Sequence, residues 1–535
     1  MSNGMIVAAQ PEAVEVGAMT LRAGGNAIDA AMACAFTQSV VDPQMAGIAG
    51  YGTMQVYMPG RGIHENLEFY ARSPLATKSD MWVHLLIGES RDGFAFLLKD
   101  HINEIGYQAP GTPASLKGFS EALKRYGTME LDDVMRPAID YARDGFMVRP
   151  YMEYYWNYDQ SALGRVTLKD QLAYSPAGRR TYFHSDGRLK RAGDIVRNPA
   201  LADTLERIAR HGPDIFYTGE IAEEIVEDFQ ANKGLLTLED LACVRTEVTE
   251  PIWGSYRGLS VASMPPPGGG VGLIQALQIL DRFNVGEMEH NGKEHLRLLA
   301  EALKRVMLDR DNHVGDPAFT DVPVSWLLSQ DRAEEHAADI REGNVAHVPR
   351  IGKPTEPKDT THVTVSDRQG NVVTMTHTLG VPSGAVTEHL GVMWNGIMSG
   401  FDPRPGRPGS LAPGKGRTSS QMPTIVFQDD RPCIALGAPG GTAIGPAMTQ
   451  GISNMVDFGM PVFDAVAAPR VSVTSVVIDI SNRIPRHVEA ELKAASYPVS
   501  RSYMGYAFAA LHAIDLRGPL SGGADPQRDG MWMRG

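Results

Sequence analysis

The chain of 535 residues is 43% hydrophobic and 21% charged, and its formal net charge at pH 7 is −13. These proportions are typical of a soluble globular protein, and the acidic balance without any Lys/Arg-rich run argues against a nucleic-acid surface. The length allows three or four domains or one large layered α/β unit. The three cysteines are far apart, which favours a reducing compartment over a disulfide framework or a zinc site.

The first eleven residues carry no basic segment followed by a long apolar stretch, and no apolar run of 18 residues occurs later. A secretory signal or a membrane-spanning helix needs these features. We therefore expect a cytoplasmic protein without a membrane partner.

The first 340 residues predict mainly helices, because apolar residues recur there at helical spacings. The segment 26–41 is rich in alanine, as befits a helix packed closely against a sheet. Short strands are predicted over 53–58 and 68–74. The predicted helical segments are 12–23, 26–41, 112–145, 201–211, 219–230 and 293–310.

Two glycine-rich segments resemble nucleotide-binding loops only superficially. Residues 265–272 lack the spacing of a dinucleotide-binding loop. Residues 409–416 begin like a phosphate loop, but Gly416 stands where the magnesium-binding Ser or Thr belongs. We therefore predict no cofactor.

A β-hairpin is predicted after a loop-like stretch over 341–358. Apolar and polar residues alternate over 360–366, turn residues follow over 367–370, and a second run covers 371–378. If the turn centres between Arg368 and Gln369, Thr360 faces His377, and a one-residue bulge moves its partner to Thr378. Either register brings the Thr378 hydroxyl close to Thr360.

Such a strand could begin at a threonine nucleophile. A threonine hydroxyl needs a neighbouring base, and an N-terminal threonine carries one in its own α-amine. The chain would expose this amine by cutting the bond between Asp359 and Thr360: the Thr360 Oγ attacks the Asp359 carbonyl, and water hydrolyses the ester. On these residues alone, an ordinary hairpin with threonines on its solvent face remains the alternative.

The C-terminal third predicts strands over 391–395, 423–428 and 433–437, an irregular Pro/Gly loop over 401–416, and a helix over 448–455. A glycine turn over 437–444 enters this helix. Its bare amide groups are suited to hold an oxyanion.

These motifs together resemble the γ-glutamyltransferase family of N-terminal nucleophile hydrolases. The resemblance covers nearly the whole length. It rests on five motifs in the family's order: 23–31 (AGGNAIDAA), 360–371 (TTHVTVSDRQGN), Ser419-Ser420 before 423–425 (PTI), 437–441 (GAPGG) and 522–526 (GGADP).

The resemblance implies a role for each matched residue. Thr360 would be the nucleophile, Thr378 its hydrogen-bond partner, and Gly440 and Gly441 the donors of the oxyanion hole. Ser419 and Ser420 match the serines that hold the substrate carboxylate.

The implied fold is an α/β (α+β) four-layer αββα sandwich. A large subunit of residues 1–359 and a small subunit of residues 360–535 together form one structural domain. The resemblance leaves a homodimer open.

Three departures from the family pattern bear on the substrate. Gly380 and Gly400 stand where members that use γ-glutamyl compounds hold the substrate α-amine with polar or acidic side chains. The family's carboxylate-binding arginine falls at Tyr70, so Arg72 becomes a candidate replacement. The resemblance therefore implies hydrolysis of an amide whose acyl group keeps a carboxylate but has no α-amine, as in the cephalosporin (glutaryl) acylases and oxamate amidohydrolases.

Three alternatives remain on sequence grounds. One is a γ-glutamyl hydrolase or transpeptidase acting on glutathione-like compounds, and another is an inactive binding or scaffold homologue. The third is a metal-dependent amidase using His362, His377 and His389, although their spacing is no ligand signature. We predict no metal site.

Overall fold

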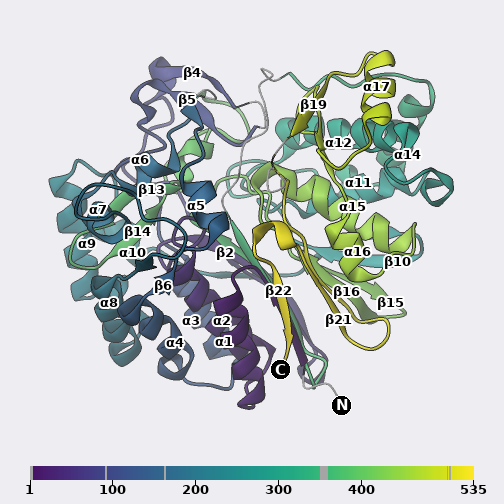
Figure 1. The fold of residues 1–535 in the computed structure, drawn as a ribbon. Coiled ribbons are helices and arrows are strands. Elements are labelled where there is room, and N and C mark those ends of the chain that lie inside the picture. Colours follow the sequence, from purple (N-terminus) through teal and green to yellow (C-terminus); the bar gives the residue numbers. More distant parts are fainter. Residues whose placement is uncertain (1–3, 91–92, 162–163, 350–359, 503, 505–507) are drawn as a thin grey trace.

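The computed structural model describes residues 4–90, 93–161, 164–349, 360–502, 504 and 508–535. It is a mixed α/β structure with two large antiparallel sheets (Figure 1). None of the helices in these ranges is both long and apolar enough to cross a bilayer.

The first sheet has seven strands in the order β22-β1-β11-β12-β2-β3-β8. Strand β11 is hydrogen-bonded along both edges, to β1 and to β12. The strands are β1 (Gly4–Ala8), β2 (Tyr51–Met58), β3 (Ile63–Phe69), β8 (Glu247–Thr249), β11 (Thr361–Asp367), β12 (Val372–Thr378) and β22 (Met531–Arg534).

The second sheet has six strands in the order β21-β20-β16-β15-β10-β9, and it packs on the first through β16 and β20. The strands are β9 (Ile252–Tyr256), β10 (Leu259–Ser263), β15 (Thr424–Gln428), β16 (Arg431–Gly437), β20 (His512–Asp515) and β21 (Ser521–Ala524). Every residue of β11 and β12 is buried, because helices cover one face of the first sheet and the second sheet covers the other.

Helices pack on the outer face of each sheet and bury two separate apolar cores (Figure 1). The first sheet is covered by α1 (Pro11–Arg22), α2 (Ala27–Val41) and α3 (Ser115–Tyr126), with α4 (Leu131–Asp144) packed against α2. The second is covered by α11 (Gly270–Leu280), α15 (Ile444–Val456) and α16 (Val462–Ala467), with α12 (Lys293–His313) packed against α11.

Helix α2 shows how local sequence fixes these layers. Its Asn26 side chain accepts hydrogen bonds from the amides of Ile28 and Asp29, and the Asp29 carboxylate accepts one from the Asn26 amide. This capping box starts the helix. All fifteen residues of α2 are buried, and small alanine side chains allow this close approach to α1, α4 and β11.

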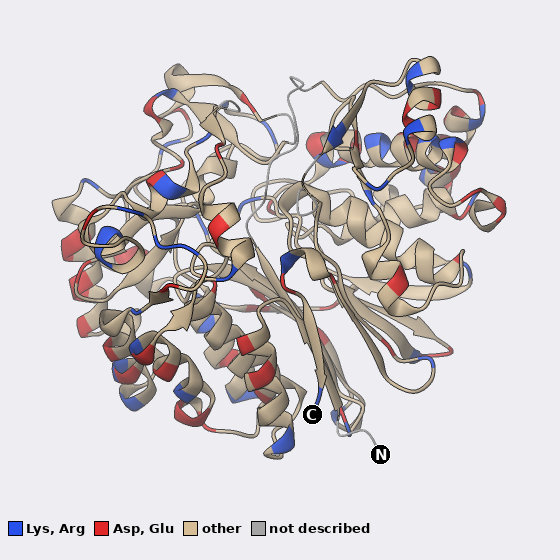
Figure 2. Cartoon of the chain, viewed as in Figure 1, with Lys and Arg blue, Asp and Glu red and all other residues tan. Residues whose placement is uncertain are grey.

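The remaining elements form the periphery. Figure 2 shows acidic and basic residues interspersed over the outer helices, whereas the strands between them are mostly uncharged. The other helices are α5 (Pro150–Trp156), α6 (Leu168–Leu172), α7 (Pro176–Tyr182), α8 (Pro199–His211), α9 (Glu220–Ala231), α10 (Leu238–Ala242), α13 (Val324–Leu327), α14 (Gln330–Arg341) and α17 (Arg486–Ala494). The other strands are β4 (Leu86–Glu89), β5 (Phe96–Leu98), β6 (Phe146–Met147), β7 (Ile195–Val196), β13 (Pro382–Thr387), β14 (Val392–Asn395), β17 (Val471–Ser472), β18 (Ile478–Ser481) and β19 (Val499–Ser502).

The structure confirms most predicted elements and corrects three points. The strand predicted over 68–74 lies earlier, at Ile63–Phe69, and the terminal strands β1 and β22 were not predicted. The threonine face of the hairpin does not meet solvent, because the second sheet lies over it: Thr364 and Thr374 are fully buried. Much of the loop predicted over 341–358 lies outside the described residues.

Candidate active site

Thr360 lies directly before β11 and faces the end of β12. Its Oγ1 is 3.2 Å from the Oγ1 of Thr378. The ladder pairs Thr361 with His377 without a bulge, so the next pair along is Thr360 and Thr378. The turn therefore centres on Gln369, and the predicted alternative that opposed Thr360 to His377 is wrong. Asp359 lies outside the described residues.

The Thr378 hydroxyl is held in place from its other side. Its oxygen accepts a hydrogen bond from the Gly380 amide at 2.8 Å. The same oxygen also accepts the hydrogen bond that the Thr360 hydroxyl donates. The pair is thus oriented by the tight turn that follows β12, in which Gly380 has a φ of 79°.

The backbone of Thr360 is strained. Its φ is 153°, a value that a β-branched residue rarely adopts. Its amide nitrogen lies 3.4 Å from the sulfur of Met45, in the segment after α2. Thr360 is 5% exposed, so this geometry is enclosed by protein.

A buried polar network supports the α2 side of the site. The Thr361 hydroxyl donates to Gln10 at 3.1 Å, and Gln10 donates in turn to Asp42. Gln38 donates to the Thr361 hydroxyl at 3.0 Å and contacts His377 at 2.8 Å. Sequence reasoning missed Gln10, Gln38 and Asp42, because only the tertiary fold brings them to the hairpin.

Burial raises the pKa of Asp42 to about 7, although the nearby Arg149 opposes this shift. Asp42 accepts hydrogen bonds from the side chains of Gln10 and Gln44. A carboxyl with such a pKa changes its charge near neutral pH, only two hydrogen bonds from Thr361.

The face of the hairpin toward the second sheet is also polar. The ring nitrogens of His362 contact the hydroxyls of Thr376 at 2.8 Å and Thr364 at 2.9 Å, and its ring stacks on His512. Burial lowers the pKa of His362 well below its usual range, so the imidazole is neutral. Both ring nitrogens take part in hydrogen bonds to threonine hydroxyls of the hairpin.

The three histidines proposed as metal ligands do not meet. His362 faces the second sheet, His377 faces α2 through Gln38, and His389 is exposed. Two of them lie on opposite faces of one sheet, so a shared ion is geometrically excluded at these residues.

The glycine turn after β16 approaches the same end of β11. Gly437 packs so closely on His362 that a Cβ at this position would lie 2.0 Å from the imidazole ring. Gly440 and Gly441 follow in the chain, and within the described ranges their amide groups donate no hydrogen bond. Two free amides in a buried turn are a suitable arrangement for binding an oxyanion.

Ser419 and Ser420 line a cavity together with Gly268, Gly269 and Thr442. Thr442 directly follows Gly441, so the two serines lie close to the glycine turn. The Ser419 hydroxyl accepts a hydrogen bond from the Gln421 amide at 3.1 Å, which fixes its position. The glycine-rich segment lines this cavity through Gly268, Gly269, Val271 and Gly272.

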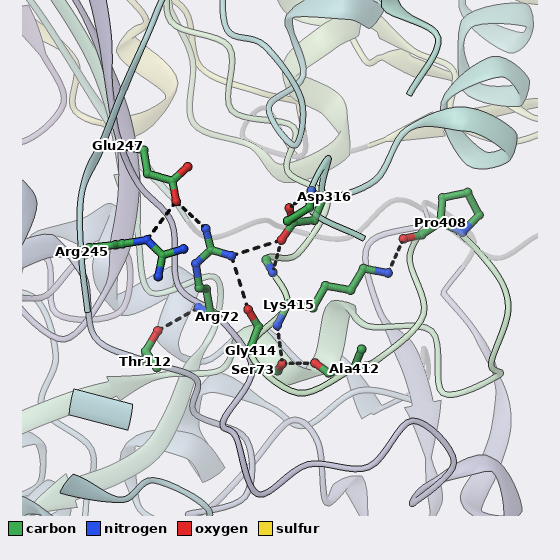
Figure 3. A network of polar contacts seen from close by, with 12 residues as sticks. Arg72, Ser73, Thr112, Arg245, Glu247, Asp316, Pro408, Ala412, Gly414 and Lys415 are labelled. Carbon is green, nitrogen blue, oxygen red and sulfur yellow. Dashed lines mark hydrogen bonds and ion pairs between the residues drawn. The ribbon is translucent and has the colours of Figure 1, made fainter. Parts of the chain in front are cut away.

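Arg72 lies in a different cavity, with Tyr70 and Pro265. Figure 3 shows its guanidinium between two carboxylates, Glu247 at 2.9 Å and Asp316 at 3.3 Å. Arg72 does not line the cavity of Ser419 and Ser420, and two carboxylates of the protein already balance its charge.

Comparisons with known proteins find relatives over nearly the whole chain. The sequence profile of the family described as Gamma-glutamyltranspeptidase matches residues 13–534. The chain is 36% identical to the acylase ACY 1 proenzyme of Pseudomonas sp. (strain SE83), over 99% of this chain and 93% of that protein. It is 32% identical to the glutathione hydrolase proenzyme of Bacillus subtilis (strain 168), over 99% and 91%.

A solved structure shows the same fold. The cephalosporin acylase from Bacillus halodurans superposes with a TM-score of 0.87 at 29% sequence identity. The superposition covers 99% of this chain and 96% of that one.

Asp42 predicts a specific pH dependence of stability. The unfolded chain ionises this group near pH 4, whereas the folded chain retains the proton up to about pH 7. Since the folded state binds more protons in this window, the contribution of Asp42 to stability falls as the pH rises from about 4 to about 7. Asp42→Asn should remove that decline, so the variant loses less stability than the parent between pH 5 and pH 7.5.

Urea unfolding of both proteins at the two pH values measures this difference. Gln44→Ala is the control, because it leaves Asp42 titratable and should keep the decline in stability. Gln44→Glu would not serve, because it adds a charge. Parallel pH curves for the parent and Asp42→Asn would contradict the assignment.

Proposed function

The chain belongs to the gamma-glutamyltranspeptidase family, and we propose that it is a self-processing amide hydrolase with Thr360 as its N-terminal nucleophile. The observation that carries this proposal is the 3.2 Å contact between the Thr360 and Thr378 hydroxyls at the buried start of β11. The helix, sheet, sheet, helix order of the layers supports the four-layer αββα sandwich of the N-terminal nucleophile hydrolases.

Processing would begin with attack of the Thr360 Oγ on the carbonyl carbon of Asp359. The C–N bond breaks, the hydroxyl proton passes to the nitrogen, and an ester joins the two residues. Water then hydrolyses the ester to give the Asp359 carboxylate and the free Thr360 amine and hydroxyl. The strained φ of Thr360 supports this step, because cutting the bond removes the restraint.

The two products would stay together as one structural domain. The large subunit of residues 1–359 supplies β1 and β2, and the small subunit of residues 360–535 supplies β11 and β12 between them. Each subunit therefore holds strands of the other's sheet through hydrogen bonds along two edges. Both relatives named above are called proenzymes, which supports such processing.

Catalysis would reuse the same groups. The Thr360 amine would accept the hydroxyl proton, the oxygen would attack the substrate amide, and the Gly440 and Gly441 amides would stabilise the oxyanion. Thr378 would keep the nucleophile oriented. Water would then release the acyl group from Thr360.

The proposed substrate is an amide whose acyl group carries a carboxylate and no α-amine. Two relatives are named as acylases, one of them a cephalosporin acylase. Gly380 and Gly400 offer no side chain for a substrate ammonium, which would then be buried without a partner. Hydrolysis of a γ-glutamyl compound is the second candidate, since other relatives are named as glutathione hydrolases.

Mutation of Thr360 tests processing. The parent should give two bands on a denaturing gel, the smaller beginning Thr-Thr-His. Thr360→Ala should give one band of 58.0 kDa and no amidase activity, because the hydroxyl is lost. Thr360→Ser should retain part of both, and a fully active protein that remains uncut would refute the proposal.

Mutation of Thr378 tests the orientation of the nucleophile. Thr378→Val keeps the shape but removes the hydroxyl, so kcat should fall roughly ten- to hundredfold, the effect of losing one hydrogen bond to a charged or reacting group. Thr378→Ser is the matched control and should retain most of the activity. Equal kcat values for Thr378→Val and the parent would show that this contact has no catalytic role.

A substrate panel distinguishes the two candidate functions. Purified protein should hydrolyse a glutaryl anilide or oxamate faster than a γ-glutamyl anilide, because the site lacks partners for the ammonium. The readout is kcat/KM for each compound. A strong preference for the γ-glutamyl anilide would favour the second candidate instead.

A further inference from the structure

Because Gly380 and Gly400 have no side chain, other side chains occupy the space beside them. A Cβ added at Gly400 would lie 1.9 Å from the Nε of Arg417, and one added at Gly380 would lie 2.9 Å from the hydroxyl of Tyr51. The positions where a substrate ammonium would need an acid or an amide are therefore occupied by a guanidinium and a phenol.

Arg417 is a buried cation without an anion. It is 9% exposed, its Nη2 donates to the Phe94 carbonyl at 2.8 Å, and its guanidinium carbon stacks 4.6 Å from the Phe94 ring centre. In the described part of the chain no carboxylate pairs with it. Arg417 lines a cavity together with Gly400 and Thr418.

Other arginines in similar surroundings have carboxylate partners. Arg165, which also lies over the Phe94 ring, pairs with Glu104 at 2.6 Å, and Arg404 in the same cavity pairs with Asp402 at 2.8 Å. Arg149 pairs with Glu12 at 2.6 Å. A buried charge is costly unless it is paired, so Arg417 is the arginine here that gains most from an anionic ligand.

Neighbouring residues link Arg417 both to the cavity of the two serines and to the nucleophile. It precedes Ser419 by two residues, and the cavity it lines shares Arg310 and Val314 with the cavity of the two serines. On its other side, Phe94 packs against Val381, the residue after Gly380. Gly380 donates its amide to the Thr378 hydroxyl, which contacts the nucleophile.

We propose that Arg417, and not Arg72, supplies the positive charge that binds the carboxylate of the acyl substrate beside Ser419 and Ser420. A guanidinium can hold a carboxylate through two parallel N–H groups, and in this position it also repels an ammonium. Arg417 is thus a specificity-determining residue. The inference rests on the proposed function, because it names the charge that selects the acyl group.

Arg417→Gln tests the inference with two matched substrates, glutaryl anilide and pentanoyl anilide, which differ only in the terminal carboxylate. The variant should raise KM for glutaryl anilide roughly ten- to hundredfold, as expected for losing a charged hydrogen-bond partner. Its kcat/KM for pentanoyl anilide should change less than about threefold. Arg417→Lys keeps the charge but not the paired geometry, so it should restore part of the affinity.

Arg72→Gln is the comparison variant. It should leave the preference for glutaryl over pentanoyl anilide unchanged, because Arg72 is already paired with Glu247 and Asp316. The appearance of two bands on a denaturing gel checks that each variant folds and matures. If Arg72→Gln lost the preference for the carboxylate and Arg417→Gln kept it, the inference would be overturned.

Calorimetric binding of glutarate separates this inference from the proposed function. A parent protein that cleaves no anilide would refute the proposed function, whereas weaker glutarate binding by Arg417→Gln would still support the role of Arg417. A parent that binds no glutarate, or a variant that binds it equally well, would refute that role.

Discussion

The site depends on the placement of β11 between β1 and β12. Because β11 is hydrogen-bonded along both edges, the residue that precedes it has little freedom, and Thr360 is held opposite Thr378 at 3.2 Å. The strand β1 comes from the very start of the described chain, and β2 lies on the far side of β12. The N-terminal segment and the hairpin therefore build one sheet together, and a cut before Thr360 would leave every one of these hydrogen bonds intact.

The polar face of the hairpin gives the second sheet a defined position. Buried hydroxyls are costly unless they are hydrogen-bonded, and here the Thr374 hydroxyl contacts the Leu436 carbonyl at 3.2 Å across the two sheets. His362 fills the space left by Gly437. These contacts fix the direction in which the chain leaves β16, and the amides of Gly440 and Gly441 follow within four residues.

The sequence predicted the elements whose signal is local. The hairpin was predicted from alternation and turn residues. Its strands pair one residue away from the predicted register without a bulge, because the Asp367 carboxylate accepts hydrogen bonds from the amides of Gln369 and Asn371. These bonds close a loop centred on Gln369. Short terminal strands such as β1 carry no such signal, since their pairing depends on distant strands. The same limit applies to Gln10, whose contact with Thr361 spans more than three hundred residues of sequence, and to Asp42, which accepts a hydrogen bond from Gln10.

The choice between Arg72 and Arg417 illustrates the same limit in electrostatic terms. In sequence both are single arginines close to a recognisable motif, and Arg72 stands nearer to the position that the family resemblance suggests. Their difference lies in partners that come from elsewhere in the chain: Asp316 and Glu247 already balance Arg72, whereas Arg417 has an aromatic ring and a carbonyl. A guanidinium that is already paired gains little from another carboxylate, and a buried one without an anion gains more. The glycine at position 400 is a condition for this arrangement, because any side chain there would displace the guanidinium. The charge of the ligand that the proposed site accepts thus depends on which arginines already have a carboxylate partner in the fold and on Arg417, which has none among the described residues.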